Sequence, residues 1–395
     1  MKIGIFGGSF DPVHQEHVRL AEEAVKSLGL DKLFIVPACQ PPHKRSKRLT
    51  SAAHRLKMCK NAFASLPQAV VSDYEIACGG TSYTYLTCRY FKEQFPDAEL
   101  FWLVGTDMLR DFPTWKHPSK ILETVKLAVC ARAEKEGWLE VEKRRFFEKF
   151  GCDFAVVPYN GKAVSSTEIR ILAGAGMRIT DFVGEENAAY IEQNSLYKIS
   201  GGKEALSLQS EKRRAHSLRV ALCAAKKAPE IFLPEDKAVS AALLHDCAKN
   251  LEASSPLLKG FEPERTWGRV PSAVWHQFAG AFVAEHALGV KDEDVLNAIR
   301  FHTSGRAEMS ELEKLIFLAD MVEDERAYEG VERLRALFWA GRGEGGLNGC
   351  LKEALKETVV HLQSKGAEIY PLTLQAYEFY NQDEKENDYE KYNKQ

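Results

Sequence analysis

The chain has 395 residues, with 45% hydrophobic and 28% charged side chains and a formal net charge of −3 at pH 7. Because single cores rarely grow beyond about 250–300 residues, this length indicates two domains. The near-neutral balance excludes the basic field that nucleic acid or an anionic membrane surface attracts. The nine cysteines include no Cys-x-x-Cys pair, and no apolar run reaches the roughly 18 residues of a membrane span. We therefore expect reduced thiols in a cytoplasmic protein without nucleic-acid or membrane partners, and homo-oligomerisation stays open.

The N-terminal segment combines an apolar strand at residues 3–6, a glycine turn at Gly7 and Gly8, and the start of a helix. Such a turn offers unpaired N–H groups and the positive end of the helix dipole to an anion. His14 and His17 fall three residues apart on one helical face, where they can bring protons or positive charge to phosphates. A plain strand–turn–helix is the alternative. The full string Gly-Gly-Ser-Phe-Asp-Pro-Val-His-x-x-His is more specific and predicts a phosphate site.

Strands and helices alternate through the first half of the chain. This rhythm predicts an α/β domain, with a doubly wound parallel sheet flanked by helices, over residues 1–198. Ligands of such sheets bind beyond the carboxyl ends of the strands, where most motifs of this half fall. We expect strands at 3–6, 32–36, 69–72, 99–104, 126–130 and 154–157, and further helices at 51–63, 84–95 and 138–150.

The opening string resembles the signature of a nucleotidyltransferase family that includes nicotinate-nucleotide adenylyltransferase, Gly-x-Phe-Asp-Pro-x-His-x-Gly-His. Glu16 stands here in place of the glycine before the second histidine. Taken singly, the later motifs have plainer explanations, such as a solvated lysine, a helix-capping aspartate or a core tryptophan. Together they resemble the family's segments in the family's order: Pro-x-x-x-Pro-Pro-His-Lys44, Ser-Tyr-Thr84, Gly-Thr-Asp107, Phe-Pro-Thr-Trp115 and Ser-Ser-Thr-x-Ile-Arg170.

The resemblance implies transfer of AMP from ATP to nicotinate mononucleotide, giving nicotinate adenine dinucleotide and pyrophosphate. Such in-line transfer requires positioning and charge stabilisation rather than a protein nucleophile. Mg²⁺ is expected to arrive with ATP, since no dedicated metal cage is evident. The residues it implies for catalysis are His14, His17, Lys44 and Arg170. Those for ATP are Gly7, Gly8, Ser9, Phe10, Gly105, Asp107, Ser166 and Thr167, and those for the mononucleotide are Thr81, Tyr83, Thr84 and Trp115.

The second half has a helical pattern almost throughout. A linker at 199–205 is expected to lead into an all-α domain at 206–380, followed by a charged, frayed tail at 381–395. The expected helices are 206–228, 235–244, 277–288, 291–301, 311–321, 331–339 and 351–363.

Histidines and aspartates accompany the apolar helical stretches of this half. A single buried histidine usually finds its hydrogen-bond partners among its neighbours. A set of six buried polar groups needs many such partners. Bound metal would satisfy them together, and mixed imidazole and carboxylate ligands suit Fe or Mn better than Zn. The groups are His216, His245, Asp246, His276, His302 and Asp320.

The pair His245-Asp246 resembles the HD phosphohydrolase superfamily. More narrowly, Arg213-x-x-His-Ser-Leu-Arg-Val, Leu-Leu-His-Asp-Cys-Ala-Lys249 and Phe-Leu-Ala-Asp320 resemble bacterial symmetrical diadenosine tetraphosphate hydrolases over residues 203–380. The resemblance implies metal-assisted hydrolysis to two ADP, within a fused bifunctional enzyme. An HD domain acting on another nucleotide, or only sensing nucleotides, is the alternative. The implied metal ligands are His216, His245, Asp246 and Asp320; His276 and His302 would bind a second ion or the substrate, and Lys249 and Arg306 its phosphates.

Overall fold

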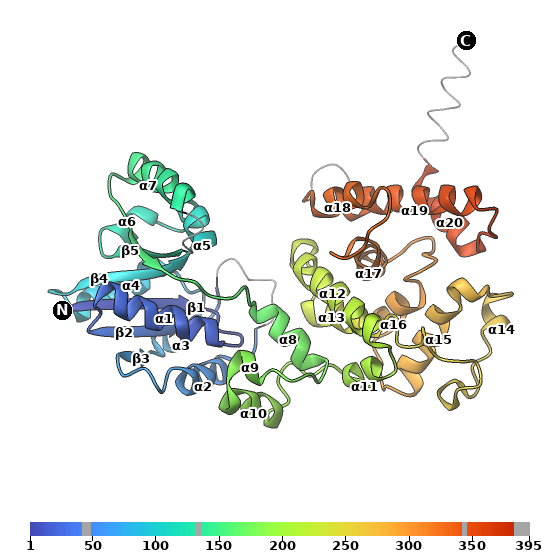
Figure 1. The fold of residues 1–395 in the computed structure, drawn as a ribbon, viewed down its shortest axis with the longest axis horizontal. Helices are drawn as coiled ribbons and strands as arrows, with labels where there is room; N and C mark the ends of the chain where they lie inside the picture. Colours follow the sequence, from blue (N-terminus) through green and yellow to red (C-terminus); the bar gives the residue numbers. More distant parts are fainter. Residues whose placement is uncertain (42–48, 132–135, 342–345, 383–395) are drawn as a thin grey trace, which may run out of the picture. The chain divides into compact units, whose positions relative to one another are not determined.

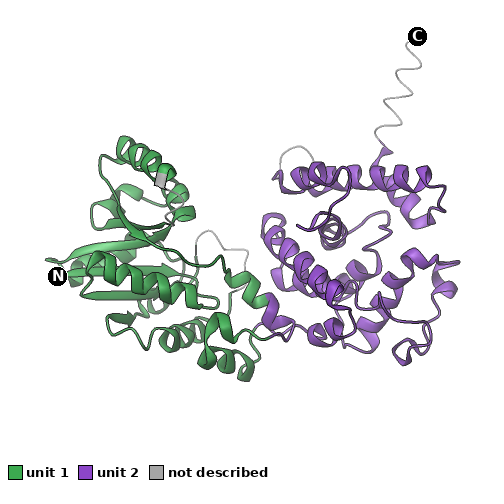
Figure 2. Cartoon of the chain, in the orientation of Figure 1, with its two compact units in different colours: residues 1–170, 178–196 green, residues 171–177, 197–395 purple. Residues whose placement is uncertain are grey.

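The computed structural model describes residues 1–41, 49–131, 136–341 and 346–382. It divides into two compact units, Met1–Arg170 with Arg178–Leu196, and Ile171–Met177 with Tyr197–Gln395 (Figure 2). We name them the first and the second unit. The predicted linker at 199–205 is helical in its second half, because α11 (Gly202–Ser207) buries Ala205 and Leu206 in the core of the second unit.

The first unit contains a six-stranded parallel sheet in the order β3-β2-β1-β4-β5-β6 (Figure 1), which confirms the predicted fold class. The chain builds one half of the sheet outward from β1 and the other outward from β4. The switch point between these two neighbouring strands is where such sheets bind ligands. The strands are β1 (Lys2–Gly8), β2 (Lys32–Pro37), β3 (Ala69–Val71), β4 (Glu99–Gly105), β5 (Lys126–Ala131) and β6 (Ala155–Pro158).

Burial on both faces explains why the central strands β2, β1, β4 and β5 are apolar runs. Ile3 and Ile5 of β1 are fully buried, and a Cβ on Gly7 would lie 2.6 Å from the Trp102 ring of β4. Glycine at this position therefore permits close packing at the switch point. The helices of this unit are α1 (Gln15–Leu28), α2 (Ala52–Ala62), α3 (Tyr74–Cys78), α4 (Thr84–Gln94), α5 (Thr106–Asp111), α6 (Pro118–Leu122), α7 (Glu136–Phe150), α8 (Ser166–Gly174), α9 (Thr180–Val183) and α10 (Glu185–Gln193).

The second unit is helical, as predicted, and α17 contacts α12, α13, α16, α18 and α19. Its buried apolar residues, including Leu315 and Leu318, form the centre of the core. In the part of the chain that the structure describes, no helix is both long and apolar enough to cross a membrane. The helices after α11 are α12 (Glu211–Lys227), α13 (Glu235–Leu244), α14 (Pro263–Trp267), α15 (Ser272–His286), α16 (Glu293–Arg300), α17 (Glu311–Val322), α18 (Val331–Trp339), α19 (Gly346–Ser364) and α20 (Pro371–Tyr380).

The single helix predicted at 206–228 is wrong. The first helix ends at Ser207, and a second helix, α12, begins after Ser210. The Ser210 hydroxyl caps α12 by accepting a hydrogen bond from the backbone N of Arg213 at 3.4 Å. A serine cap outweighs continuous apolar spacing at this point. The helices α14 and α20 were not predicted. In the predicted tail, Asn381 is buried and the residues from 383 onward lie outside the described chain.

Candidate active sites

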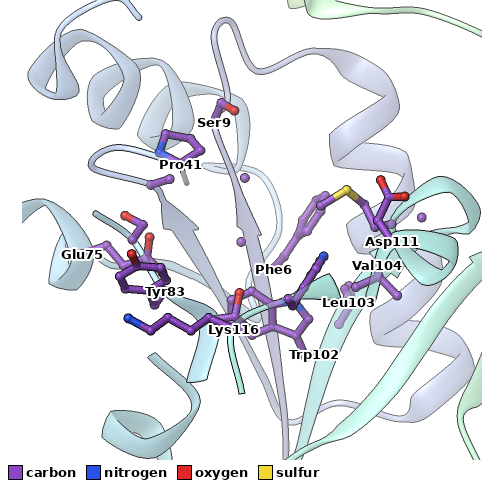
Figure 3. A pocket seen from close by; sticks show the side chains of 18 residues that line it. Phe6, Ser9, Pro41, Glu75, Tyr83, Trp102, Leu103, Val104, Asp111 and Lys116 are labelled. Atoms are coloured by element: carbon purple, nitrogen blue, oxygen red, sulfur yellow. The ribbon is translucent and has the colours of Figure 1, made fainter. Parts of the chain in front are cut away.

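A cavity of about 390 Å³ opens at the carboxyl ends of β1 and β4 (Figure 3). Glu75, Tyr83 and Lys116 gather on one side of it, across from Asp111. The Lys116 Nζ lies 4.2 Å from the centre of the Tyr83 ring. The predicted nucleotide-binding residues that line this cavity are Gly7, Gly8, Ser9, Tyr83, Thr84, Gly105 and Trp115.

The predicted residues Phe10, Thr81 and Asp107 are not among those that line the cavity. Phe10 is buried, with its ring centre 5.2 Å from that of His17. Thr81 forms an isolated parallel β-bridge with Gln40. A Cβ on Gly105 would lie 2.5 Å from the Asp107 carboxylate, so only glycine lets that carboxylate fold back over the strand end.

The two histidines meet at the start of α1. The backbone N of His14 donates to Nδ1 of His17 at 3.1 Å, and the ring centres lie 3.7 Å apart. Because Nδ1 of His17 accepts this bond, its ring proton sits on Nε2. His14 is buried, and its Nδ1 has no hydrogen-bond partner among the described residues. Burial lowers the pKa of His14 to about 4, although the charge of Glu16 opposes this shift, so the ring is neutral at pH 7.

The N-terminus of α8 lies against residues 11–14, which we call the histidine loop. The Ser166 hydroxyl donates to the carbonyl of Pro12 at 2.9 Å, and Arg170 Nη1 donates to the carbonyl of Asp11 at 2.6 Å. Arg170 Nη2 also donates to the Thr167 hydroxyl at 3.0 Å. The structure therefore brings together both predicted phosphate-binding segments. Lys44 lies outside the described residues, and its role stays a prediction.

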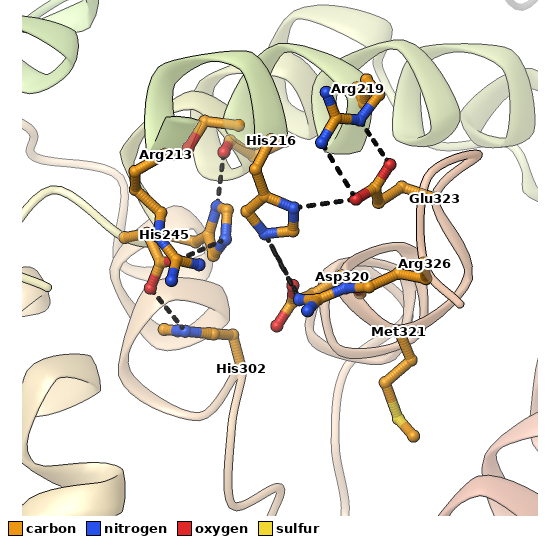
Figure 4. Close-up of polar contacts among 12 residues, drawn as sticks. Arg213, His216, Arg219, His245, His302, Asp320, Met321, Glu323 and Arg326 are labelled. Carbon is orange, nitrogen blue, oxygen red and sulfur yellow. Dashed lines mark hydrogen bonds and ion pairs between the residues drawn. The ribbon is translucent and has the colours of Figure 1, made fainter. Parts of the chain in front are cut away.

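In the second unit, the six predicted groups converge on one centre. Figure 4 shows His216, His245, His302 and Asp320 turned toward one another. His216 Nε2 lies 2.8 Å from Asp320, and Nε2 of His276 and of His302 lie 3.5 and 3.6 Å from Oδ1 of Asp246. The trios whose ligand atoms lie within 4.8 Å of one another are His216–His245–Asp246, His245–His302–Asp320 and Asp246–His276–His302.

Hydrogen bonds fix which nitrogen of the His245 and His302 rings faces this centre. Nδ1 of His245 donates to the carbonyl of Ala242 at 2.7 Å, and Nδ1 of His302 donates to that of Ile299 at 2.8 Å. Their Nε2 lone pairs consequently face inward, as metal ligands require.

The charges of the centre, and its donor atoms without hydrogen-bond partners, fit a cation. Nε2 of His245 and Oδ1 of Asp246 are buried and make no hydrogen bond within the described chain. Burial acts to raise the pKa of Asp246, but His245 and His302 hold it well below its usual range. Burial, His302 and Lys249 lower the pKa of His276 to about 2, which keeps that ring neutral and able to coordinate. Buried nitrogen and carboxylate donors without partners fit a divalent metal.

The chain matches the cytidylyltransferase-like family model over residues 5–171 and the HD domain model over 213–324. A relative from Mycoplasma pneumoniae, named probable nicotinate-nucleotide adenylyltransferase/Ap4A hydrolase, is 30% identical over 340 residues, 82% of this chain and 89% of the relative. The chain belongs to the family of this bifunctional relative, nicotinate-nucleotide adenylyltransferase/Ap4A hydrolase. A probable nicotinate-nucleotide adenylyltransferase from Clostridium botulinum is 38% identical over 50% of this chain and 98% of its own. A crystal structure of a predicted HD superfamily hydrolase involved in NAD metabolism, from Clostridium acetobutylicum, is 32% identical over 46% of this chain and 97% of its own, with a TM-score of 0.39.

Sequence reasoning missed residues that support the adenylyltransferase site. Arg55 is 1% exposed and donates to the carbonyls of Ser9, Cys39 and Thr50 at 2.8, 3.2 and 2.9 Å. It therefore ties together the chain segments beside the cavity. Backbone carbonyls leave no trace in a sequence, and the only signal was a basic residue within a helix. Glu75 was also missed.

The HD domain likewise has outer partners that were not predicted as such. Arg213 pairs with Asp246 at 2.6 Å, Arg326 pairs with Asp320, and Glu323 lies 3.1 Å from Nδ1 of His216. The Lys249 Nζ lies 2.9 Å from Nε2 of His276, beside the centre, and its predicted contact with substrate phosphates stays a prediction.

Arg306, which was predicted to contact phosphate, makes an ion pair with Glu313. Its Nε and Nη2 donate to both carboxylate oxygens of Glu313 at 2.8 and 2.7 Å. Glu313 is 1% exposed, so its buried charge needs this bidentate partner. In the described geometry Arg306 forms this ion pair, and its role as a phosphate contact stays a prediction.

Proposed function

We propose that the first unit transfers AMP from ATP to nicotinate mononucleotide, and that the second unit hydrolyses diadenosine tetraphosphate to two ADP with bound divalent metal. The observation that carries the first activity is the meeting of the His14–His17 pair with the α8 N-terminus beside the switch-point cavity. The neutral Nε2–H of His17 and the guanidinium of Arg170 are suited to the charge that develops on transferred phosphates. Mg²⁺ would accompany ATP.

The acceptor side of the cavity suits an aromatic acid. Tyr83 and Trp115 supply ring surfaces for a pyridine, and Lys116 supplies a positive charge. The buried Nε1–H of Trp115 has no hydrogen-bond partner in the described part of the chain, so it remains available to a carboxylate. These features support nicotinate mononucleotide as the acceptor, with Thr81 and Thr84 in the adjacent loop.

The HD proposal rests on the inward-facing imidazoles and on Asp246. His216, His245, Asp246 and Asp320 would hold the metal, which we propose to be Fe or Mn because of the mixed donor set. When bound, such an ion activates water for attack on a phosphoanhydride. His276 and His302 would bind a second ion or orient the substrate, and Lys249 would meet its phosphates.

Hydrolysis of another nucleotide, or sensing alone, remains the second candidate for the HD domain. The complete ligand set favours hydrolysis, since a sensor has no need of it. The test is to assay the purified chain with ATP plus nicotinate mononucleotide, and separately with diadenosine tetraphosphate. Formation of dinucleotide plus pyrophosphate, and of two ADP, supports both proposals. Inertness toward diadenosine tetraphosphate, in a metal-loaded chain that transfers AMP, would refute the second.

A further inference from the structure

Glu16 is a buried carboxylate at the position where the adenylyltransferase signature has glycine. Its side chain accepts hydrogen bonds from the Tyr159 hydroxyl at 2.5 Å, the backbone N of Lys162 at 2.8 Å and Arg19 Nη1 at 2.7 Å. The Tyr159 hydroxyl also lies 3.1 Å from the Glu16 carbonyl. A buried carboxylate beside a phosphate site would repel the substrate unless its charge were compensated, and these donors compensate it.

The partner segment is shaped around this carboxylate. A Cβ on Gly161 would lie 1.9 Å from the Tyr159 hydroxyl and 2.2 Å from Oε2 of Glu16. Any other residue at 161 would therefore force the hydroxyl and the carboxylate apart. Tyr159, Gly161 and Glu16 fit one another across a long separation in sequence, which argues against a chance surface contact.

The contact joins the two halves of the phosphate site. Glu16 lies between His14 and His17 in the first turn of α1. Residues 159–162 follow β6 and lead into α8, which carries Ser166 and Arg170. The contacts of these two residues with the histidine loop already hold one side of α8. The Glu16–Tyr159 pair anchors the segment that delivers α8 to this position.

We propose that Glu16 is a positioning residue of the ATP site: its latch with Tyr159 holds the N-terminus of α8 opposite His14 and His17. This inference rests on the proposed adenylyltransferase function. A preformed site avoids the ordering cost that a loose segment would impose when the triphosphate binds. The acceptor side of the cavity, with Tyr83 and Trp115, makes none of these contacts. Loss of the latch should therefore weaken ATP binding selectively.

The test compares full-length variants in steady-state adenylyl transfer, with KM measured separately for ATP and for nicotinate mononucleotide. For Glu16→Ala we expect the KM for ATP to rise about tenfold or more, with the KM for the mononucleotide within about twofold. Tyr159→Phe removes only the donor hydroxyl and should raise the KM for ATP about threefold. Because both changes break one latch, the double variant should be no worse than Glu16→Ala.

Two further variants separate positioning from general damage. Glu16→Gln keeps an oxygen that can accept from both Tyr159 and Lys162, so it should restore most ATP affinity. Glu22→Gln alters an exposed glutamate on the same helix and should match the wild type. Additive effects in the double variant, equal rises in both KM values, or an unchanged KM for ATP would overturn the inference. If Glu16→Ala does not fold, Tyr159→Phe decides by the same criteria. A wild-type chain that fails to transfer AMP would refute the proposed function, a result distinct from variants that merely match an active wild type.

Discussion

Nδ1 of His216 lies 3.1 Å from Oε1 of Glu323, and the same carboxylate accepts a bond from Arg219 Nε at 2.6 Å. Glu323 is 2% exposed, so this arrangement is fixed within the packed core (Figure 4). It holds the imidazole proton on Nδ1 and turns Nε2 toward Asp320, 2.8 Å away. Outer carboxylates of this kind orient metal-binding histidines.

Removing this carboxylate should therefore weaken metal binding. We expect Glu323→Ala to lower divalent-metal affinity by about 10–100-fold, and Glu323→Gln to lower it less because its oxygen can still accept from Nδ1. Titration of the chelator-stripped chain with Mn²⁺ or Fe²⁺ measures this directly. Glu264→Ala, at an exposed position on α14, is the matched control. Equal affinities for Glu323→Ala and the control would contradict the orienting role.

His17 should be essential for adenylyl transfer. Replacing it with Ala removes the Nε2–H donor at the transferred phosphate and should reduce turnover by about 10²-fold or more. Hydrolysis of diadenosine tetraphosphate by the same preparation serves as the control for folding. Near-normal transfer by His17→Ala would show that the assigned role is wrong.

The enzyme should prefer nicotinate mononucleotide to its amide. A carboxylate can use the Trp115 indole N–H and the Lys116 charge, whereas the neutral amide gains less from either. A site that pairs with a specific polar group discriminates strongly against an analogue lacking it. The ratio of the two kcat/KM values is the measurement. Equal efficiencies would mean that this wall of the cavity does not select the acid.

The pH response of His14 should reflect its burial. Its pKa is lowered to about 4 in the free site, against an ordinary value of 6.5. Between these pH values the unfolded chain binds a proton that the folded chain excludes, so this residue makes folding less favourable as pH falls from 6.5 toward 4. An NMR titration of the His14 ring measures the pKa. Bound triphosphate should raise it, because the anion stabilises the charged ring. A value near 6.5 in the free protein would contradict the described burial.

The sequence predicted the sheet well because its physical signal is local. Ile3 and Ile5 belong to an apolar run bounded by glycines, which is what a strand buried on both faces requires. The break between α11 and α12 was missed because Ser210 interrupts an otherwise continuous apolar spacing. A capping hydroxyl competes with helix continuation, and spacing alone does not reveal which of them prevails.

The site could be predicted only where the residue type itself indicates a catalytic or metal-binding role. Histidines and aspartates at the HD centre were found in this way, whereas Arg55 and Glu323 act through partners distant in sequence. The ion pair between Arg306 and Glu313 likewise could not be predicted from the sequence. Arginine suits both phosphate and carboxylate, so the sequence left its partner undetermined.

The central claim is that the chain holds two chemically independent active sites, and Asp246→Ala tests it most directly. This change removes the carboxylate shared by the inward-facing histidines, so bound metal and hydrolysis should both be lost. Asp236→Asn, at an exposed position at the start of α13, is the matched control. Metal content and both activities are measured on each variant. The account predicts loss of metal and of diadenosine tetraphosphate hydrolysis, with adenylyl transfer nearly unchanged. Retained metal and hydrolysis, or a parallel collapse of transfer in a folded protein, would contradict it.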